Sequence, residues 1–156
     1  MSQNYEEKAK RILSGISYAT VATVTPEGKA WNSPVAHDMD ENHNIYWFSD
    51  KENEHSKNIR NNPSIFIVIY DSTAPDGEGE GVYIEALAEE LTNEVEIDTV
   101  LRINPNNKEK GSDFLGENVR RCYKAIPQRM WLNDAEEKDG VFIRDYRVEI
   151  DLLKEA

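Results

Sequence analysis

A change from apolar to polar residues at Ser49 marks the segment of this chain that is best suited to bind a charged group. Ile45-Tyr-Trp-Phe48 is apolar and aromatic, whereas residues 49–60 contain two serines, two asparagines, one histidine and two lysines. A strand that leads through a loop into a helix places unpaired backbone N–H groups beside such side chains, and these groups attract anions. We therefore expect residues 43–60 to bind an anion, in particular the phosphate of a cofactor.

Three other features could do chemistry, but their patterns point elsewhere. Residues 37–43 contain two histidines and two aspartates, yet their spacing matches no closed zinc site. Residues 85–90 contain three glutamates, but the chain has 30 acidic residues, so a solvated face is the simpler explanation. Cys122 is the single cysteine, which excludes an intrachain disulfide, and we expect it to be a small core residue rather than a nucleophile.

The strong negative charge of the chain limits the partners that we expect. Its 156 residues carry a net charge of −12, with a sequence pI near 4.7, so nucleic acid and anionic membranes are repelled. The N-terminus lacks the apolar segment of a signal peptide, and no apolar run is as long as a membrane span. Together with the low cysteine content, these features predict a cytoplasmic protein with no nucleic-acid or membrane partner.

Sequence patterns predict the elements that must position residues 43–60. The spacing of apolar residues over 4–14 predicts an amphipathic helix. Residues 16–24 and 29–37 are rich in strand-forming residues and are joined by a tight turn. Pro34 in the second strand cannot donate a ladder hydrogen bond, so it indicates a sheet edge, a bulge or a place where a ligand contacts the backbone.

The remaining elements predict a barrel. The continuous apolar run at 64–70 predicts a strand buried on both faces, and the acidic, glycine-containing segment 71–81 predicts a flexible connection rather than a phosphate-binding loop. Further elements are predicted as a strand at 45–48, a strand at 82–91, a helix at 93–103, a helical turn near 113–115 and strands at 119–126, 129–132 and 141–153. We therefore expect one domain, residues 1–156, with a mainly β (α+β) fold: an antiparallel β-barrel with short flanking helices.

Several segments, taken in order, carry a resemblance to a known family. They are Ala19-Thr-Val-Ala-Thr-Val24, Gly28-Lys-Ala-Trp-Asn-Ser-Pro-Val35, Tyr46-Trp-Phe-Ser49, His55-Ser-Lys-Asn-Ile-Arg-Asn-Asn-Pro63 and Ala125-Ile-Pro-Gln-Arg-Met-Trp131. In this order they resemble the flavin-binding split-barrel family of pyridoxamine 5′-phosphate oxidase-like proteins, over residues 10–152. The ordered set, with its helix end Asn-Ile-x-x-Asn-Pro before an apolar strand, is more specific than any single motif.

The resemblance implies a homodimer with FMN bound in a groove at the subunit interface. It would place the flavin ring against the backbone of Ser33, Pro34 and Val35, and the phosphate on the Ser49 hydroxyl. Arg144 or Arg147 would reach the cofactor from the partner subunit. The cofactor-binding residues implied in this way are Trp31, Asn32, Ser33, Pro34, Val35, Phe48, Ser49, His55, Ser56, Lys57, Trp131, Asn133 and Arg144.

The chain departs from the family pattern at the phosphate. The family often has a lysine where this chain has His55, and a serine and an arginine where it has Asn53 and Glu54. Because histidine is only partly cationic near neutral pH, we expect a weaker or pH-dependent grip on the phosphate. Ser56 and Lys57 could compensate for part of this loss.

The leading functional hypothesis is an FMN-dependent oxidoreductase that acts on an unassigned small-molecule substrate or electron donor. No residue stands out as an obligatory acid or base, which fits a flavin reductase. Oxidation of pyridoxamine phosphate is expected to be weak or absent, because Asp38 stands where the family binds the substrate phosphate with a lysine. The alternatives are a flavin-binding or stress-associated protein without turnover, and a reductase that uses the deazaflavin F420.

Overall fold

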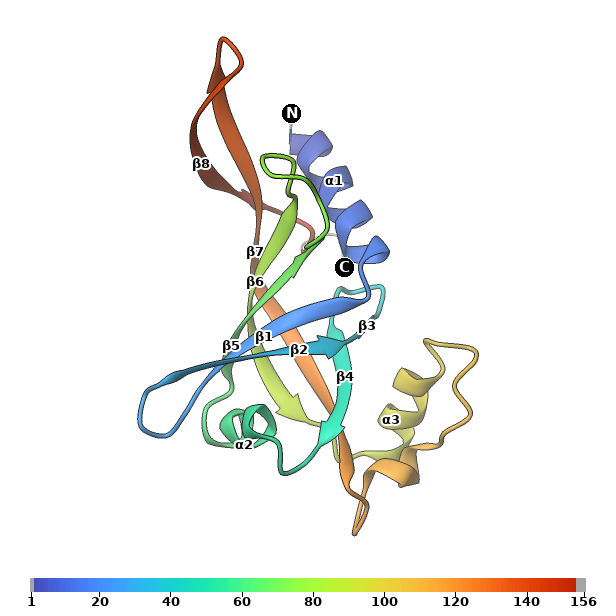
Figure 1. Ribbon diagram of the computed structural model, residues 1–156. Helices are drawn as coiled ribbons and strands as arrows, with labels where there is room; N and C mark the ends of the chain where they lie inside the picture. The colour runs from blue at the N-terminus through green and yellow to red at the C-terminus, as the bar shows by residue number, and fades with distance from the viewer. Residues whose placement is uncertain (1, 154–156) are drawn as a thin grey trace.

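The computed structural model describes residues 2–153, which form one eight-stranded antiparallel sheet with three α-helices and a short 3-10 helix (Figure 1). The elements are α1 (Ser2–Gly15), β1 (Tyr18–Val24), β2 (Ala30–Ala36), β3 (Asp38–Met39), β4 (Ile45–Asp50), α2 (Glu54–Asn61), β5 (Ser64–Tyr70), β6 (Gly81–Glu90), α3 (Glu94–Leu101), η1 (Gly111–Phe114), β7 (Arg120–Lys138) and β8 (Val141–Ile150). The strand order is β2-β1-β5-β6-β7-β4-β3, and β8 pairs with β7 outside this order.

The sheet curls into a barrel that is not closed. β2 leads directly into β3, which pairs with β4 only through Asp38↔Tyr46 and Met39↔Ile45. Within residues 2–153, β2 and β4 make no ladder with one another, so the barrel is split between them. The predicted antiparallel split barrel with short flanking helices is therefore confirmed.

Alternate residues of the strands fill the inside of the barrel. On β5, Ile65, Ile67 and Ile69 are buried, whereas Phe66 and Val68 between them are only half-buried. The prediction that both faces of residues 64–70 are buried is therefore wrong for the single chain. The apolar run correctly predicted a strand at residues 64–70, but the outer face of this strand, β5, is only partly covered.

Helix α1 covers part of the barrel with one apolar face. It packs against β5, β6 and β8, and its residues Ala9, Ile12 and Leu13 are buried as the helical spacing predicts. Burying a side chain of the size of Ile12 or Leu13 contributes about 1.5–3 kcal/mol. No helix within residues 2–153 is long and apolar enough to cross a membrane.

Helix α3 and η1 form a second, smaller core against the opposite face of β4. Phe48 packs against Phe114 of η1, with ring centroids 4.6 Å apart, and Tyr46 and Cys122 are buried in the same cluster. Burial raises the pKa of the Cys122 thiol to about 12. Cys122 is therefore a core residue, as expected from the sequence, and not a reactive thiolate.

Strand β7 is longer than the sequence suggested. Residues 119–126 and 129–132 were predicted as separate strands, but β7 runs without a break over 19 residues. Its register against β6 shifts between Glu85↔Arg129 and Ala86↔Pro127. This bulge accommodates Pro127, which cannot donate a ladder hydrogen bond, without ending the strand.

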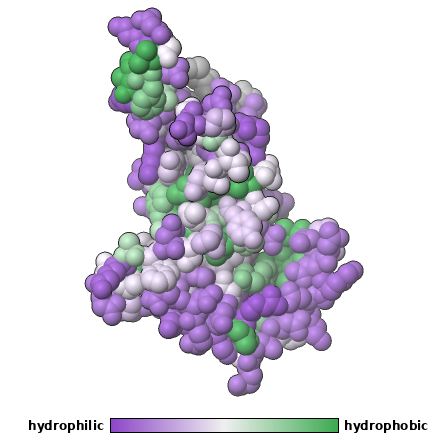
Figure 2. All heavy atoms as spheres, in the orientation of Figure 1, coloured by the Kyte–Doolittle hydropathy of each residue, from purple (hydrophilic) through white to green (hydrophobic). Residues whose placement is uncertain are grey.

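The β7–β8 hairpin extends beyond the barrel (Figure 1). Near its turn, Val141, Phe142 and Ile143 are 65%, 58% and 49% exposed. Figure 2 shows hydrophobic side chains gathered near the end of this hairpin, just below hydrophilic side chains at its tip. An exposed apolar cluster of this kind is typical of a surface that contacts another molecule.

Candidate functional site

The junction between β4 and α2 is held in place by hydrogen bonds to Asp50. The Asp50 carboxylate accepts from the backbone N–H of Glu52 at 2.8 Å, and its carbonyl accepts from the N–H of Asn53 at 3.1 Å. The Ser56 hydroxyl donates to the same carbonyl at 2.8 Å. These bonds form the tight turn that brings the start of α2 back beside the end of β4.

This turn places His55 against Ser49. His55 Nε2 lies 3.1 Å from Ser49 Oγ, and the imidazole is only 7% exposed. Burial lowers the pKa of His55, so its neutral form is favoured near neutral pH. The two residues that the resemblance assigns to the phosphate therefore lie in direct contact.

The first turn of α2 has mixed consequences for an anion. The N-cap residue Asn53 makes no side-chain capping bond, so its side chain does not occupy the helix start, where the helix dipole favours negative charge. Glu54 in the same turn would repel an anion. Ser56 is buried by its bond to Asp50, and Lys57 is exposed on the helix surface.

The two arginines around this junction already have partners, and Arg60 donates to the Lys51 carbonyl of the β4–α2 turn at 2.6 Å. Arg121 lies opposite Ser49 in the β4–β7 ladder, but its guanidinium donates to the carbonyls of Asn118 at 2.7 Å and Gly116 at 2.6 Å. Arg60 pairs with Glu90 at 3.0 Å. His55 is therefore the residue in contact with Ser49 that can supply positive charge to a bound anion.

Strand β2 lies on the other side of the split. It pairs only with β1 among the described residues, so its second edge is available to a ligand, as Pro34 predicted. Trp31 is 46% exposed, Asn32 and Pro34 are exposed, Ser33 is half-buried and Val35 is buried. Helix α2 packs against both β1 and β2, and the Asn58 amide donates to Thr23 Oγ1 at 2.9 Å. The helix that carries His55 therefore lies against the strand that carries residues 31–35.

Trp131 and Asn133, the implied cofactor-binding residues on β7, lie in a different region from Ser49 and His55. Trp131 stacks on Phe66 with ring centroids 6.1 Å apart, and the side chain of Asn133 accepts from Gly81 N at 2.8 Å. Ser49 pairs with Arg121, and Trp131 lies ten residues further along β7, roughly 30 Å at the rise of a strand. One chain therefore does not bring Trp131 and Asn133 to the Ser49–His55 pair.

Arg147 rather than Arg144 belongs to this aromatic region. The Arg147 guanidinium lies 4.0 Å from the ring centroid of Tyr83 and 5.7 Å from that of Phe66, the ring on which Trp131 stacks. Arg144 lies on the protruding hairpin and pairs with Glu136 at 2.8 Å. Alternation along the strand had placed the two arginines on opposite faces, but it could not show which face carries the aromatic residues.

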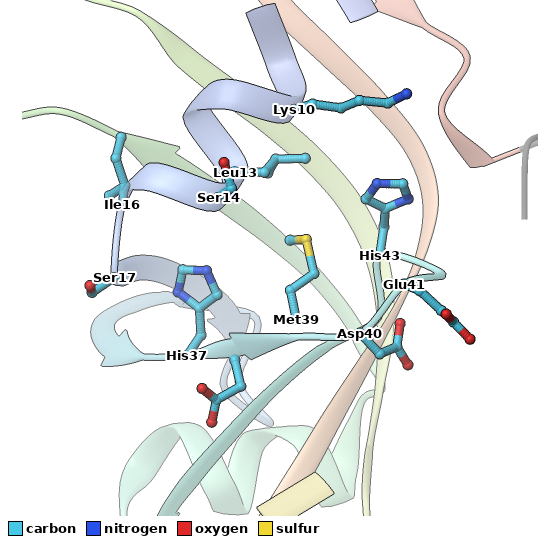
Figure 3. Close-up of a pocket in the computed structure, with 11 residues that line it drawn as sticks. Lys10, Leu13, Ser14, Ile16, Ser17, His37, Met39, Asp40, Glu41 and His43 are labelled. Atoms are coloured by element: carbon cyan, nitrogen blue, oxygen red, sulfur yellow. The ribbon is translucent and has the colours of Figure 1, made fainter. Parts of the chain in front are cut away.

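A cavity of about 490 Å³ lies between α1 and β3, away from Ser49 and His55. Figure 3 shows His37, Met39 and His43 on one side of it, and Lys10 and Leu13 of α1 on the other. Burial lowers the pKa of His37, and its buried Nδ1 has no hydrogen-bond partner among the described residues. The sequence analysis considered residues 37–43 as metal ligands and Asp38 as a residue that repels a substrate phosphate. It did not predict this cavity, because the spacing of these residues does not show that α1 packs opposite them.

Strain in the backbone helps to direct one of these side chains. His43 has a φ of 66°, in the left-handed region that is uncommon for residues other than glycine, although histidine adopts it more often than most. Asp40 holds this turn: its carboxylate accepts from Asn42 N, Asn44 N and the Tyr46 hydroxyl at 2.8–3.0 Å. Such strained positions are frequent at functional sites.

Comparison with known proteins gives a family match along most of the chain. The family model described as pyridoxamine 5′-phosphate oxidase matches residues 5–135. No curated protein sequence matches this chain.

Similar folds occur among solved structures with low sequence identity. A heme-binding protein from Mycobacterium smegmatis has a TM-score of 0.70 at 18% identity, over 96% of this chain and 59% of that protein, so this chain spans less than two thirds of its length. A candidate pyridoxamine 5′-phosphate oxidase from Listeria innocua has a TM-score of 0.64 at 19% identity, over 81% and 96%. HutZ, the heme storage protein of Vibrio cholerae, has a TM-score of 0.65 at 15% identity, over 81% and 92%.

Proposed function

This chain belongs to the pyridoxamine 5′-phosphate oxidase family, and we propose that it is an FMN-binding oxidoreductase that acts as a homodimer on a small molecule. The observation that carries this proposal is the contact between Ser49 and His55 at a strand–helix junction, across the split from the unpaired edge of β2. A hydroxyl, an imidazole and a helix start form a donor set that suits a phosphate ester.

The residues of the split have distinct roles in this proposal. Ser49 and His55 would hold the phosphate, and the backbone of Ser33, Pro34 and Val35 would lie along the flavin ring. FMN, when bound, supplies hydride or single-electron transfer. The absence of an assigned acid or base among these residues favours a reductase, in which the chain mainly binds and orients the cofactor.

A homodimer is proposed because the predicted residues fall into two separate groups. Trp131 and Asn133 lie roughly 30 Å along β7 from the strand position opposite Ser49, too far to share one cofactor within a chain. A second copy that presents its Trp131 and Arg147 to the split would complete the site. The half-exposed outer face of β5 and the apolar end of the β7–β8 hairpin are surfaces that such a copy could cover.

Turnover separates the proposed enzyme from a protein that only binds flavin. A nicotinamide donor should bleach the bound yellow cofactor, and an electron acceptor should restore the colour. Protein that binds FMN but is reduced by no donor would favour the binding protein without turnover. Pyridoxamine phosphate should be a poor substrate, because Asp38 would repel its phosphate.

Heme is a second candidate cofactor, favoured by the cavity between α1 and β3. Imidazole and thioether groups are axial ligands of heme iron, and His37, Met39 and His43 face this one cavity (Figure 3). Two of the solved structures with this fold are a heme-binding and a heme storage protein.

Titration of the purified protein with FMN, F420 and hemin distinguishes these candidates. The FMN proposal expects saturable binding of FMN that is weakened in Ser49→Ala and unchanged in His37→Ala. The heme proposal expects the opposite: a strong heme absorption band that is lost in His37→Ala and unaffected by Ser49→Ala. Preferential binding of F420 would replace FMN as the cofactor while leaving the flavin-type site in place.

A further inference from the structure

The residues that would hold the phosphate contain no permanent positive charge. His55 is 7% exposed, and the described residue in hydrogen-bond contact with its ring is Ser49, through Nε2. A lysine in this position would stay protonated across the physiological range, whereas an unperturbed histidine titrates near pH 6.5. The charge state of this site therefore depends on the proton at His55.

Neighbouring elements do not supply the missing charge. Strand β2 contains no titratable side chain, and on β4 the Asp50 carboxylate is used by the turn. On β7, Arg121 donates to carbonyls in residues 116–120. Arg60 of α2 pairs with Glu90 of β6 and also donates to the Lys51 carbonyl in the turn before α2.

Four further charged side chains lie in this segment: Lys51 and Glu52 in the turn before α2, and Glu54 and Lys57 on α2 itself. Glu54 is in the first turn and is half-buried, whereas Lys57 is exposed. Because Lys57 is two positions from His55, a helix points their side chains in different directions. Glu54 disfavours an anion directly, so a bound phosphate needs a counter-charge close to it.

We propose that a phosphate monoester and one proton bind together at Ser49 and His55, so that this chain selects FMN over riboflavin most strongly at mildly acidic pH. This inference rests on the proposed FMN site and adds to it a specificity-determining residue. Phosphate monoesters lose their second proton near pH 6. At pH 7.5 the free ester is a dianion and buried His55 is neutral, so one proton from solvent enters the complex and is shared by the imidazole and the phosphate.

The pH dependence of the affinity ratio follows from this proton. Above about pH 7, each unit of pH should reduce the affinity for FMN by up to tenfold, because one proton must be taken up on binding. Riboflavin has the same ring but lacks the phosphate, so its affinity should not follow this trend. The lowered pKa of His55 in the ligand-free protein agrees with this scheme, because the imidazole is then neutral before FMN binds.

The experiment measures FMN and riboflavin dissociation constants by flavin fluorescence from pH 6 to 8.5, for the wild-type chain and for His55→Gln and His55→Lys. Wild type should favour FMN strongly at pH 6 and lose that preference as pH rises. His55→Gln should bind FMN about 10- to 100-fold more weakly at pH 6, because a charge-assisted hydrogen bond is lost. His55→Lys should keep its preference for FMN up to pH 8.5, since lysine remains charged.

Two further measurements do not depend on whether His55→Gln and His55→Lys fold. Calorimetric titration of wild type with FMN at pH 7.5, in buffers of different ionisation enthalpy, should report uptake of about one proton. Glu54→Gln should tighten FMN binding at every pH, whereas Glu52→Gln in the exposed turn before α2 is the matched control and should not.

The outcomes separate this inference from the proposed function. If wild type binds no FMN at any pH, the cofactor assignment itself is overturned. If FMN binds with no proton uptake, or with an FMN-to-riboflavin ratio that does not change with pH, only the coupling to His55 is overturned.

Discussion

At the scale of single residues, burial decides what the candidate side chains can do. Ser49 and His55 are six positions apart, and the turn around Asp50 brings their polar atoms to 3.1 Å. Burial also lowers the pKa of His55, which favours its neutral form, and raises the pKa of the Cys122 thiol, which disfavours the thiolate. From the sequence, Ser49 could be assigned to a phosphate only by resemblance, and His55 could equally have been a surface residue. Neither the contact nor the burial follows from spacing, because both depend on how α2 packs on the barrel.

Ser49→Ala should lower the affinity for FMN by about 10- to 100-fold, because a hydrogen bond to a charged group contributes about 1.5–3 kcal/mol. Isothermal titration at pH 6.5 measures this change. Ser64→Ala, which alters an exposed serine at the start of β5, is the control and should bind FMN like wild type. Equal affinity in Ser49→Ala and wild type would place the phosphate elsewhere.

The two buried histidines should make the ligand-free protein less stable in mild acid. The pKa values of His37 and His55 are lowered by burial, so the unfolded chain binds more protons than the native chain once pH falls below about 6.5. The contribution of these neutral histidines to the free energy of unfolding should therefore be fully present above pH 6.5 and decrease as the pH falls below it. Urea unfolding at several pH values tests this, and His55→Gln should show a shallower decrease. A slope that His55→Gln leaves unchanged would contradict the assignment to His55.

At the scale of elements, local patterns predicted most strands and helices, and non-local pairing decided the rest. The helix at 4–14, the strands at 16–24 and 64–70 and the helix at 93–103 all occur, with ends shifted by a few residues. The break predicted near Pro127 does not occur, because a bulge against β6 carries the strand past it. The two-residue strand β3 was not predicted, since so short a segment pairs only because β4 lies beside it.

Gly111→Ala should destabilise the α3–η1 unit. A Cβ at Gly111 would overlap the carbonyl oxygen of Glu94 and approach Asp98 Oδ1, which accepts the Gly111 N–H at 2.5 Å. Overpacking of this kind costs about 1–3 kcal/mol, so thermal unfolding should shift to lower temperature. Gly79→Ala is the matched control, because its Cβ would meet nothing within 4 Å. Equal melting temperatures for the two variants would show that η1 is free to move away from α3.

At the scale of the whole molecule, the residues assigned to the cofactor lie on two separate surfaces, and in the proposed dimer each surface would supply one half of a site. Ser49, His55 and the edge of β2 line the split, whereas Trp131 and Arg147 lie on the outer face of the sheet. The sequence predicted both groups by resemblance, but it could not show that one chain keeps them apart. This separation depends on the length of β7, which is one strand of 19 residues and not the two shorter strands that the sequence predicted.

Mixed dimers test whether two chains share one site. Ser49→Ala and Trp131→Ala chains, co-expressed with different tags, form a mixed dimer that contains one site with both substitutions and one unaltered site. We expect this dimer to bind one FMN with wild-type affinity, while each homodimer binds weakly. Weak binding at both sites of the mixed dimer would mean that Ser49 and Trp131 of one chain serve the same site.

The most direct test of the account is the absorption spectrum of the purified wild-type protein during titration with FMN at pH 6.5. We predict a yellow protein, or one that takes up added FMN to saturation at one FMN per chain, with a perturbed flavin band and a dimeric mass by light scattering. A colourless protein that takes up no FMN at this pH would contradict the assignment of Ser49 and His55 to a flavin phosphate.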